Sequence, residues 1–192
     1  MLDLAPATSE LARIVEGVRD DQLTAPTPCA GSSLGDLLDH VAGLSVAFAA
    51  AATKTRLAGG SQPRADASQL APDWRTRIPA QLDALAAAWR TDAAWAGVTE
   101  AGGGELPAQV MGLVALDEVI VHGWDIAKAS GQPFSCDANL IPAAQQFVQG
   151  TVERYPQGSR GLFGPPVPVS ADASPLDRLI ALTGRDPAWR PA

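Results

Sequence analysis

The sequence predicts an all-α protein. Apolar residues recur at intervals of three and four in five separate stretches of the 192-residue chain, as the buried face of an α-helix requires. No convincing alternation of apolar and polar residues, the mark of a half-buried strand, is found. A segment rich in proline and glycine follows the fifth stretch, and a shorter helical pattern closes the chain. We therefore expect one domain, residues 1–192, with a helical bundle over 1–155 and a wrapping tail with a short helix over 156–192.

The first three helices are expected over residues 8–19, 34–57 and 72–90. Pro26, Pro28 and Gly31 predict a loop between the first and the second. Ser33, followed three residues later by Asp36, is a typical helix start.

The ends of the second and third helices are marked by glycine and proline. Gly59 and Gly60 are expected to end the second helix, and a polar surface connection follows. Pro79, inside the third pattern, indicates either a kink or a later start of that helix.

The fourth helix contains the most informative stretch, LDEVIVHGWDIAKASG at residues 116–131. Pro107 suits its first turn and Gly131 its C-terminal end. Glu118 and His122 are four residues apart, so both side chains emerge from one helical face, which is otherwise the apolar face that a bundle buries. A buried carboxylate is costly unless it is compensated, so Glu118 needs a cation, a hydrogen-bond partner or a proton.

A fifth helix over residues 137–154 leads into the tail. The run YPQGSRGLFGPPVPVSADA, residues 155–173, is too rich in proline and glycine to be helical throughout, and we expect it to wrap over the bundle. Phe163, Val167 and Val169 offer apolar points of attachment. Ser174 then starts a short last helix that ends at Gly184.

Composition and charge exclude some partners. A net charge of −7 argues against a nucleic-acid partner, which would favour a basic surface. The first residues lack a secretory signal, and the longest apolar stretch, residues 41–52, is shorter than a membrane span. Cys29 and Cys136 are far apart in the sequence, and we expect free thiols in a reducing compartment. The predicted protein is cytoplasmic.

His40 falls on the inner face of the second helix and completes a candidate metal site with Glu118 and His122. Bundle cores commonly hold such sites, built from side chains of facing helices. Two histidines and one carboxylate leave positions open for water or substrate, as in catalytic zinc and non-haem iron sites. The only two histidines of the chain thus both lie on inward faces, which favours a metal site.

A simpler alternative pairs each histidine with a nearby carboxylate, His40 with Asp36 and His122 with Glu118 or Asp125. Asp125 itself has several alternatives at this stage. It either orients an imidazole or a water, or binds the metal, or forms an ion pair with Lys128. For Cys29, a buried or idle thiol is the preferred interpretation, since nothing in its local sequence marks it as reactive.

Five motifs occur in order along the chain: TPC at 27–29, LLDHVAGL at 37–44, DEVIVHGWDIAKASGQ at 117–132, FGPPVPV at 163–169 and SPLDRLIALTGRDP at 174–187. Together they resemble the actinobacterial DinB-like metal-binding proteins related to mycothiol-dependent maleylpyruvate isomerase. The resemblance implies a DinB-like four-helix bundle and a divalent metal, usually zinc, held by His40, Glu118 and His122. Nickel and iron are alternatives.

The sequence departs from this family in two places. The family's tryptophan shortly after TPC is absent, and Ser32 stands near its place. The large C-terminal domain of the isomerase is replaced by the short tail, which argues against maleylpyruvate as the substrate.

Three functions fit these residues. The preferred one is a metal-dependent enzyme that holds a small thiol, mycothiol by resemblance, as a thiolate. The thiolate adds to an electrophilic small molecule, giving S-transfer or isomerisation, with Asp125 as orienting group or proton acceptor. The second is a noncatalytic metal- or ligand-binding module, and the third a metal-dependent hydrolase with Asp125 as general base. The oligomeric state is open, with a homodimer as one alternative.

Overall fold

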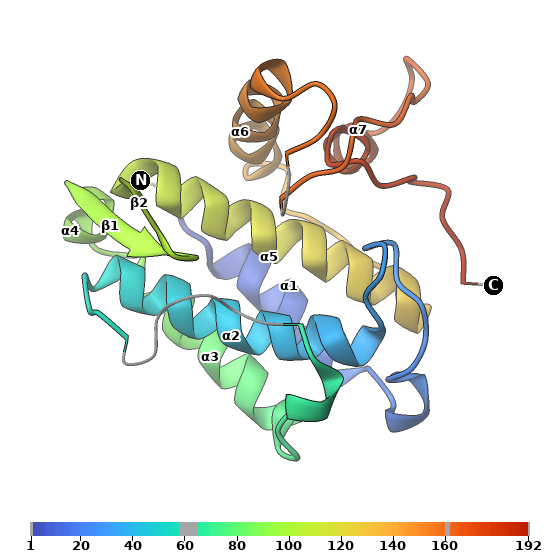
Figure 1. Ribbon diagram of the computed structural model, residues 1–192, viewed down its shortest axis with the longest axis horizontal. Coiled ribbons are helices and arrows are strands. Elements are labelled where there is room, and N and C mark those ends of the chain that lie inside the picture. The colour runs from blue at the N-terminus through green and yellow to red at the C-terminus, as the bar shows by residue number, and fades with distance from the viewer. Residues whose placement is uncertain (1, 58–64, 160–161, 192) are drawn as a thin grey trace.

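The computed structural model describes residues 2–57, 65–159 and 162–191 (Figure 1). This part of the chain is mostly helical, which confirms the predicted fold class. Its helices are α1 (Ala5–Glu16), α2 (Leu34–Ala52), α3 (Trp74–Ala88), α4 (Asp92–Trp95), α5 (Ala108–Ser130), α6 (Ile141–Arg154) and α7 (Pro175–Leu182). Two 3₁₀ turns, η1 (Asp20–Gln22) and η2 (Ala67–Gln69), lie in the connections.

Four of the helices form a bundle. α1 and α2 each pack against both α3 and α5, so the four surround one core. That core is built from fully buried aliphatic side chains of all four helices, among them Leu11, Val41, Leu82 and Leu116. Their spacing of three and four along each helix is the pattern that predicted the bundle.

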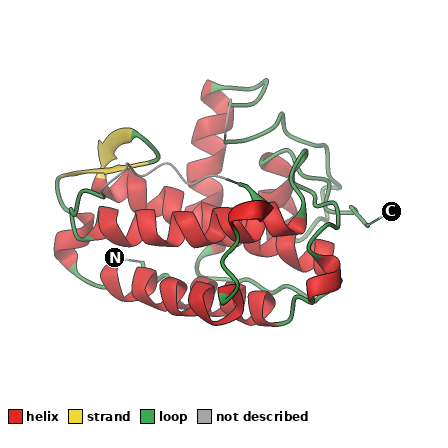
Figure 2. Cartoon of the chain, turned by 60° about the horizontal axis from the view of Figure 1, so that its bottom comes forward, coloured by secondary structure: helices red, strands yellow, loops and turns green. Residues whose placement is uncertain are grey.

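A β-hairpin interrupts the helical chain between α4 and α5. β1 (Val98–Ala101) pairs antiparallel with β2 (Gly104–Pro107), at one end of the molecule (Figure 2). The sequence showed no convincing strand pattern here, because each strand has only four residues, too few for a visible alternation. Gly102 and Gly103 both have positive φ, as a tight two-residue hairpin turn requires.

Helix boundaries differ from the expected ones by a few residues. α2 ends at Ala52, where the Thr53 hydroxyl donates to the Ala49 and Ala50 carbonyls, rather than near residue 57. The expected stop at Gly59 and Gly60 lies outside the described residues. α1 begins three residues early and α6 four residues late, whereas Pro79 lies inside a continuous α3.

α2 has the length and mean hydropathy of a membrane span, unlike the shorter apolar run on which the sequence expectation was based. Of the described helices it alone meets that criterion. Its apolar residues are largely buried against α3 and α5, and a core helix passes the same test. The criterion is therefore weak evidence for a membrane location.

The tail lies on the α5 side of the bundle, opposite α3 (Figure 1). Ile180 of α7 packs with Val121 and Trp124 of α5. Phe163 is buried and meets Phe147 of α6 edge to face. Val169 was expected to dock but is exposed. The tail therefore covers the same helix that carries Glu118 and His122.

Candidate metal centre

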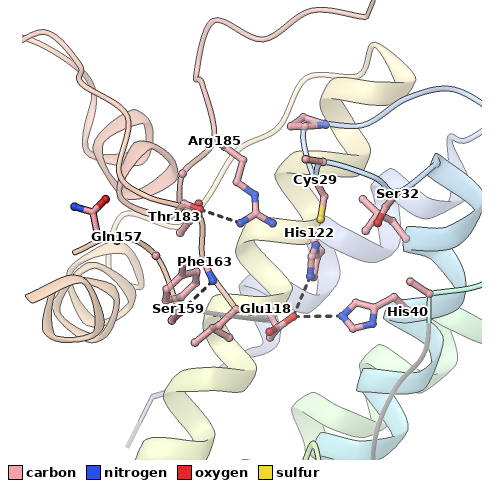
Figure 3. Close-up of a pocket in the computed structure, with 18 residues that line it drawn as sticks. Cys29, Ser32, His40, Glu118, His122, Gln157, Ser159, Phe163, Thr183 and Arg185 are labelled. Atoms are coloured by element: carbon pink, nitrogen blue, oxygen red, sulfur yellow. Dashed lines mark hydrogen bonds and ion pairs between the residues drawn. The ribbon is translucent and has the colours of Figure 1, made fainter. Parts of the chain in front are cut away.

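α2 and α5 bring the three predicted ligands together. Ser33 caps α2 by accepting a hydrogen bond from the backbone N–H of Asp36, and the helix then carries His40 on the face toward α5. Glu118 and His122 emerge one above the other from α5, toward His40 (Figure 3). The site is thus held by two packed helices rather than by loops.

The three side chains converge on one point. Glu118 Oε2 lies 3.0 Å from His122 Nε2 and 3.6 Å from His40 Nε2. The candidate ligand atoms all lie within 4.8 Å of one another. The two imidazole rings are nearly perpendicular, with centroids 5.0 Å apart. These separations are compatible with one ion shared by the three atoms.

The chemistry of these donors fits a divalent metal ion. Glu118 Oε2 is inaccessible to solvent, yet it accepts no well-oriented hydrogen bond from the described residues. Its polar neighbours are the His122 and His40 nitrogens at 3.0 and 3.6 Å, so a buried anionic oxygen and two imidazole nitrogens face a common point that suits a cation. Two imidazole nitrogens and one carboxylate are a common ligand set for zinc and for non-haem iron.

Electrostatics favour a charged Glu118. Burial acts to raise the pKa of this carboxyl, but the imidazoles of His122 and His40 outweigh burial and hold the pKa well below its usual range. Burial acts to lower the pKa of His122, whereas the carboxylates of Asp125 and Glu118 outweigh it and raise that pKa to about 10. The site is therefore an anion facing two imidazoles.

Asp125 is paired with Arg185 of the tail. Its carboxylate is fully buried and accepts hydrogen bonds from Arg185 at 3.0 and 3.3 Å and from His122 Nδ1 at 3.1 Å. The alternative partner, Lys128, instead donates to the Pro187 carbonyl at 3.0 Å. An ion pair between Asp125 and Lys128 was therefore the wrong alternative.

Asp36 does not contact His40, so that part of the simpler alternative was wrong. Its carboxylate accepts hydrogen bonds from the Ser33 N–H and hydroxyl and from the backbone N–H of Ala67. Asp36 caps α2 and ties the segment near residue 67 to it. The ionic neighbour of His40 is Glu118, whose Oε2 lies 3.6 Å from His40 Nε2.

A pocket of about 640 Å³ opens beside the three candidate ligands. One wall is helical and carries Leu37, His40, Glu118 and His122. The opposite wall, which we call the tail wall, consists of residues 157–159, 162–164 and 183–185. The volume suits a small organic ligand.

Two glycines shape the tail wall. Gly184 has φ +84°, and a Cβ atom there would lie 2.7 Å from the Gly164 Cα. The Gly164 N–H donates to the Thr183 carbonyl at 3.2 Å. This contact between two backbone segments fixes the position of the backbone at Arg185, the residue that follows Gly184.

Two residues of the pocket were not assigned to it from the sequence. Arg185 stands in the SPLDRLIALTGRDP motif, but no local pattern links it to Asp125, 60 residues away. Cys29 was interpreted as idle, yet it lines the pocket, and its sulfur lies within 4.8 Å of a ligand atom of His122 and of Asp125. The TPC motif that contains Cys29 was the only signal.

Comparisons with known proteins identify the family of this chain. Residues 4–127 match the family model described as the mycothiol maleylpyruvate isomerase N-terminal domain. Two Mycobacterium tuberculosis proteins, "Uncharacterized protein MT0763" of strain CDC 1551 / Oshkosh and "Uncharacterized protein Rv0738" of strain ATCC 25618 / H37Rv, are each 31% identical over 191 residues. The alignment covers 93% of this chain and 93% of each relative.

Among solved structures, the crystal structure of the mycothiol-dependent maleylpyruvate isomerase is similar, with a TM-score of 0.59 and 20% identity. The structure of a histidine-to-alanine mutant of that enzyme matches equally well. The match covers 78% of this chain and 66% of the isomerase chain. At this identity the similarity shows a shared fold.

Proposed function

We propose that this chain, which belongs to the mycothiol maleylpyruvate isomerase N-terminal domain family, is a metal-dependent enzyme that uses a low-molecular-weight thiol. The observation that carries the proposal is the convergence of His40, Glu118 and His122 on a pocket, around the buried Glu118 Oε2. Zinc is the first candidate for the ion, with nickel and iron as alternatives. Mycothiol is the first candidate for the thiol, because the matching family and structure carry that name.

The roles of the surrounding residues follow from their contacts. Asp125 accepts a hydrogen bond from His122 Nδ1, which fixes the ring and directs Nε2 toward Glu118. Arg185 holds Asp125 in turn, so the tail orients the imidazole through the carboxylate. Asp125 is therefore proposed as an orienting group, one of the roles that the sequence left open.

The reaction is proposed to begin with a thiolate. A divalent ion held by the three side chains would favour the deprotonated form of a bound thiol at neutral pH. The sulfur would then add to an electrophilic carbon of a second small molecule. S-transfer results if the new bond persists, and isomerisation results if the sulfur leaves again. Phe163 and Leu37 add apolar side chains to the lining of the pocket.

The two alternative functions have less support. A closed, noncatalytic site with Asp125 as fourth ligand is disfavoured, because Asp125 contacts the opposite edge of the His122 ring and is engaged with Arg185. A hydrolase needs a general base, and Asp125 is fully buried and doubly paired. Turnover of an ester or amide without a thiol would support the hydrolase function instead.

The setting of the enzyme is part of the proposal. We place it in the cytoplasm, as one domain over residues 1–192, with a small-molecule thiol and an electrophile as partners and with neither nucleic acid nor membrane. A homodimer is compatible with it. The chain spans 66% of the isomerase chain, so maleylpyruvate is one of several electrophiles to be tried.

Elemental analysis of the purified chain beside its His40→Ala variant tests the metal site. We expect about one divalent ion per wild-type chain and a loss of the ion in the variant. Asp39→Ala, at the neighbouring position of α2, is the matched control and should retain the ion. Absence of metal from the wild type after incubation with zinc, nickel or iron would refute the proposal.

Activity is tested by following thiol consumption with maleylpyruvate and other electrophilic acids. A metal-loaded wild type should accelerate the reaction, and His122→Ala should not. Equal rates for the two proteins would reject the thiol-dependent function even if the metal binds.

A further inference from the structure

Cys29 occupies a fixed position in the loop before α2. The Thr27 hydroxyl lies 3.1 Å from the Cys29 carbonyl and 2.9 Å from the Ser32 carbonyl, and donates to them. The backbone N–H of Ser32 donates to the same Cys29 carbonyl at 3.1 Å. These bonds form a small closed turn, so the thiol is presented from a defined backbone rather than from a loose loop.

The thiol is one member of a cluster of chemically active groups. Its sulfur lies within 4.8 Å of a ligand atom of His122 and of Asp125. Arg185 contacts Asp125 from the same side, and Figure 3 shows its guanidinium, Cys29 and His122 side by side. Burial acts to lower the pKa of Arg185, but Asp125 and then Cys29 act to raise it, with a net upward shift. The Cys29 sulfur therefore stands beside a guanidinium at the wall of the pocket, in a partly exposed position.

The guanidinium also decides against a second metal site in this cluster. Cys29, His122 and Asp125 offer three ligand atoms at suitable distances. However, Arg185 already donates to Asp125 with two nitrogens, and a further cation there would be repelled. The thiol is therefore available for covalent chemistry rather than for coordination at this cluster.

The pocket itself is built to receive a ligand. Cys29 and Ser32 line it together with His40, Glu118 and His122. At about 640 Å³ the pocket has room for a small molecule attached to the wall.

We propose that Cys29 is a site of mixed-disulfide formation, at which a small disulfide entering the pocket leaves half of itself attached to the protein. The Cys29 thiolate attacks one sulfur of the disulfide, the sulfur–sulfur bond breaks, and the other half departs as a thiolate that takes up a proton. The disulfide is the oxidant, so electrons balance. The attached group lies beside His40 and Glu118 and closes the site until a thiol removes it.

The second cysteine provides an internal comparison. Cys136 is outside the pocket, and its sulfur faces the Asp137 carbonyl at 3.7 Å. Burial, followed by the negative charges of Asp137 and Glu10, raises the pKa of this thiol to about 11. Cys136 is thus a thiol of the same chain that lies outside the pocket and has a raised pKa, which lowers its reactivity.

The test uses the full-length folded protein and bis(2-hydroxyethyl) disulfide as the probe, with intact mass and peptide mapping as readouts. We expect one adduct per chain, located at Cys29 and formed at least about tenfold faster than any adduct at Cys136. Cys136→Ser should keep the fast adduct and Cys29→Ser should lose it. Equal rates at the two cysteines, or no adduct at Cys29 while both thiols react in denaturant, would overturn the proposal.

A second variant tests whether the probe enters through the pocket. Ser32→Trp places a large side chain beside Cys29, and circular dichroism verifies its fold. The rate at Cys29 should fall severalfold while the rate at Cys136 stays unchanged; an unchanged rate at Cys29 would contradict entry through the pocket. Both experiments read covalent mass on the protein, so they can succeed or fail independently of the metal-dependent activity.

Discussion

The helical wall and the tail wall of the pocket are built in different ways. The helical wall presents His40, Glu118 and His122 from two packed helices of the bundle. The tail wall presents Arg185 from the turn after α7, held by a contact between two glycines and by backbone hydrogen bonds. The candidate ligands therefore stand on rigid elements, whereas the wall opposite them consists largely of irregular backbone.

This difference assigns different properties to the two walls. Packed helices hold donor atoms to the narrow tolerance that metal binding needs. An irregular segment tolerates changes in sequence more readily, so it is the wall on which a preference for one substrate is most easily altered. The Arg185–Asp125–His122 chain of contacts joins the two, and the following predictions separate their contributions.

The largest effect on metal binding is expected from Glu118→Gln in the helical wall. The substitution keeps the shape of the side chain and removes the charged donor between the imidazoles, so metal affinity should fall by about 100-fold or more. Equilibrium dialysis with zinc measures it. Glu153→Gln, an exposed position on α6, is the matched control. Retained affinity in Glu118→Gln would remove this carboxylate from the ligand set.

Arg185→Gln, which breaks the connection between the walls, should lower the free energy of unfolding by about 3–5 kcal/mol. The reason is that Asp125, fully buried, would lose its cationic partner. Urea denaturation measures the change. The double variant Asp125→Asn/Arg185→Gln should recover part of the loss, as expected when the two side chains interact. Strict additivity would contradict the coupling.

Within the tail wall, Gly184→Ala should cost more than Gly131→Ala. Both glycines have positive φ, so alanine at either position carries a backbone penalty of roughly 1–2 kcal/mol. At Gly131 a Cβ atom would meet nothing within 4 Å, whereas at Gly184 it would meet Gly164. Thermal unfolding of the two variants measures the difference in stability. Equal losses of stability would mean that the tail backbone shifts to accommodate the added Cβ atom at Gly184.

The smallest effect is expected at the start of α2, from Asp36→Asn. Hydrogen bonds from Ser33, then from Ala67, hold the pKa of Asp36 below its usual range. A carboxyl whose pKa is lower in the folded state stabilises the protein at pH values above its unfolded-state pKa. This stabilisation is lost as the pH falls through the folded-state pKa. The variant should thus be about 1 kcal/mol less stable at pH 7, with the difference closing as the pH falls below the ordinary range of a carboxyl pKa. Urea denaturation at several pH values checks this, and a pH-independent difference would contradict it.

The helical half of the molecule was predictable because its information is local. Leu11, Leu82 and Leu116 belong to periodic patterns that each identify a buried helical face. His40, Glu118 and His122 fall on such faces, so their convergence could be predicted, although their role as ligands is still a prediction. The hairpin at Val98–Ala101 was missed because four residues are too short a pattern.

The tail half was less predictable because its contacts are long-range. Proline and glycine indicated an extended segment, but neither gives a direction in space. The pairing of Arg185 with Asp125 depends on where α7 docks, which no periodicity within the tail encodes. Cys29 was misplaced for a related reason, since its neighbours in space come from α5 and the tail rather than from its own loop.

The pairing of Arg185 with Asp125 makes the tail a thermodynamic reporter of the site. Irregular surface segments open locally at a lower free energy than a bundle core. Because opening the tail would release Arg185 from Asp125, and Asp125 fixes His122, any ligand that prefers the fixed imidazole also opposes the opening. Amide hydrogens near Gly164 and Thr183, in the tail wall, would then exchange more slowly when the pocket is filled.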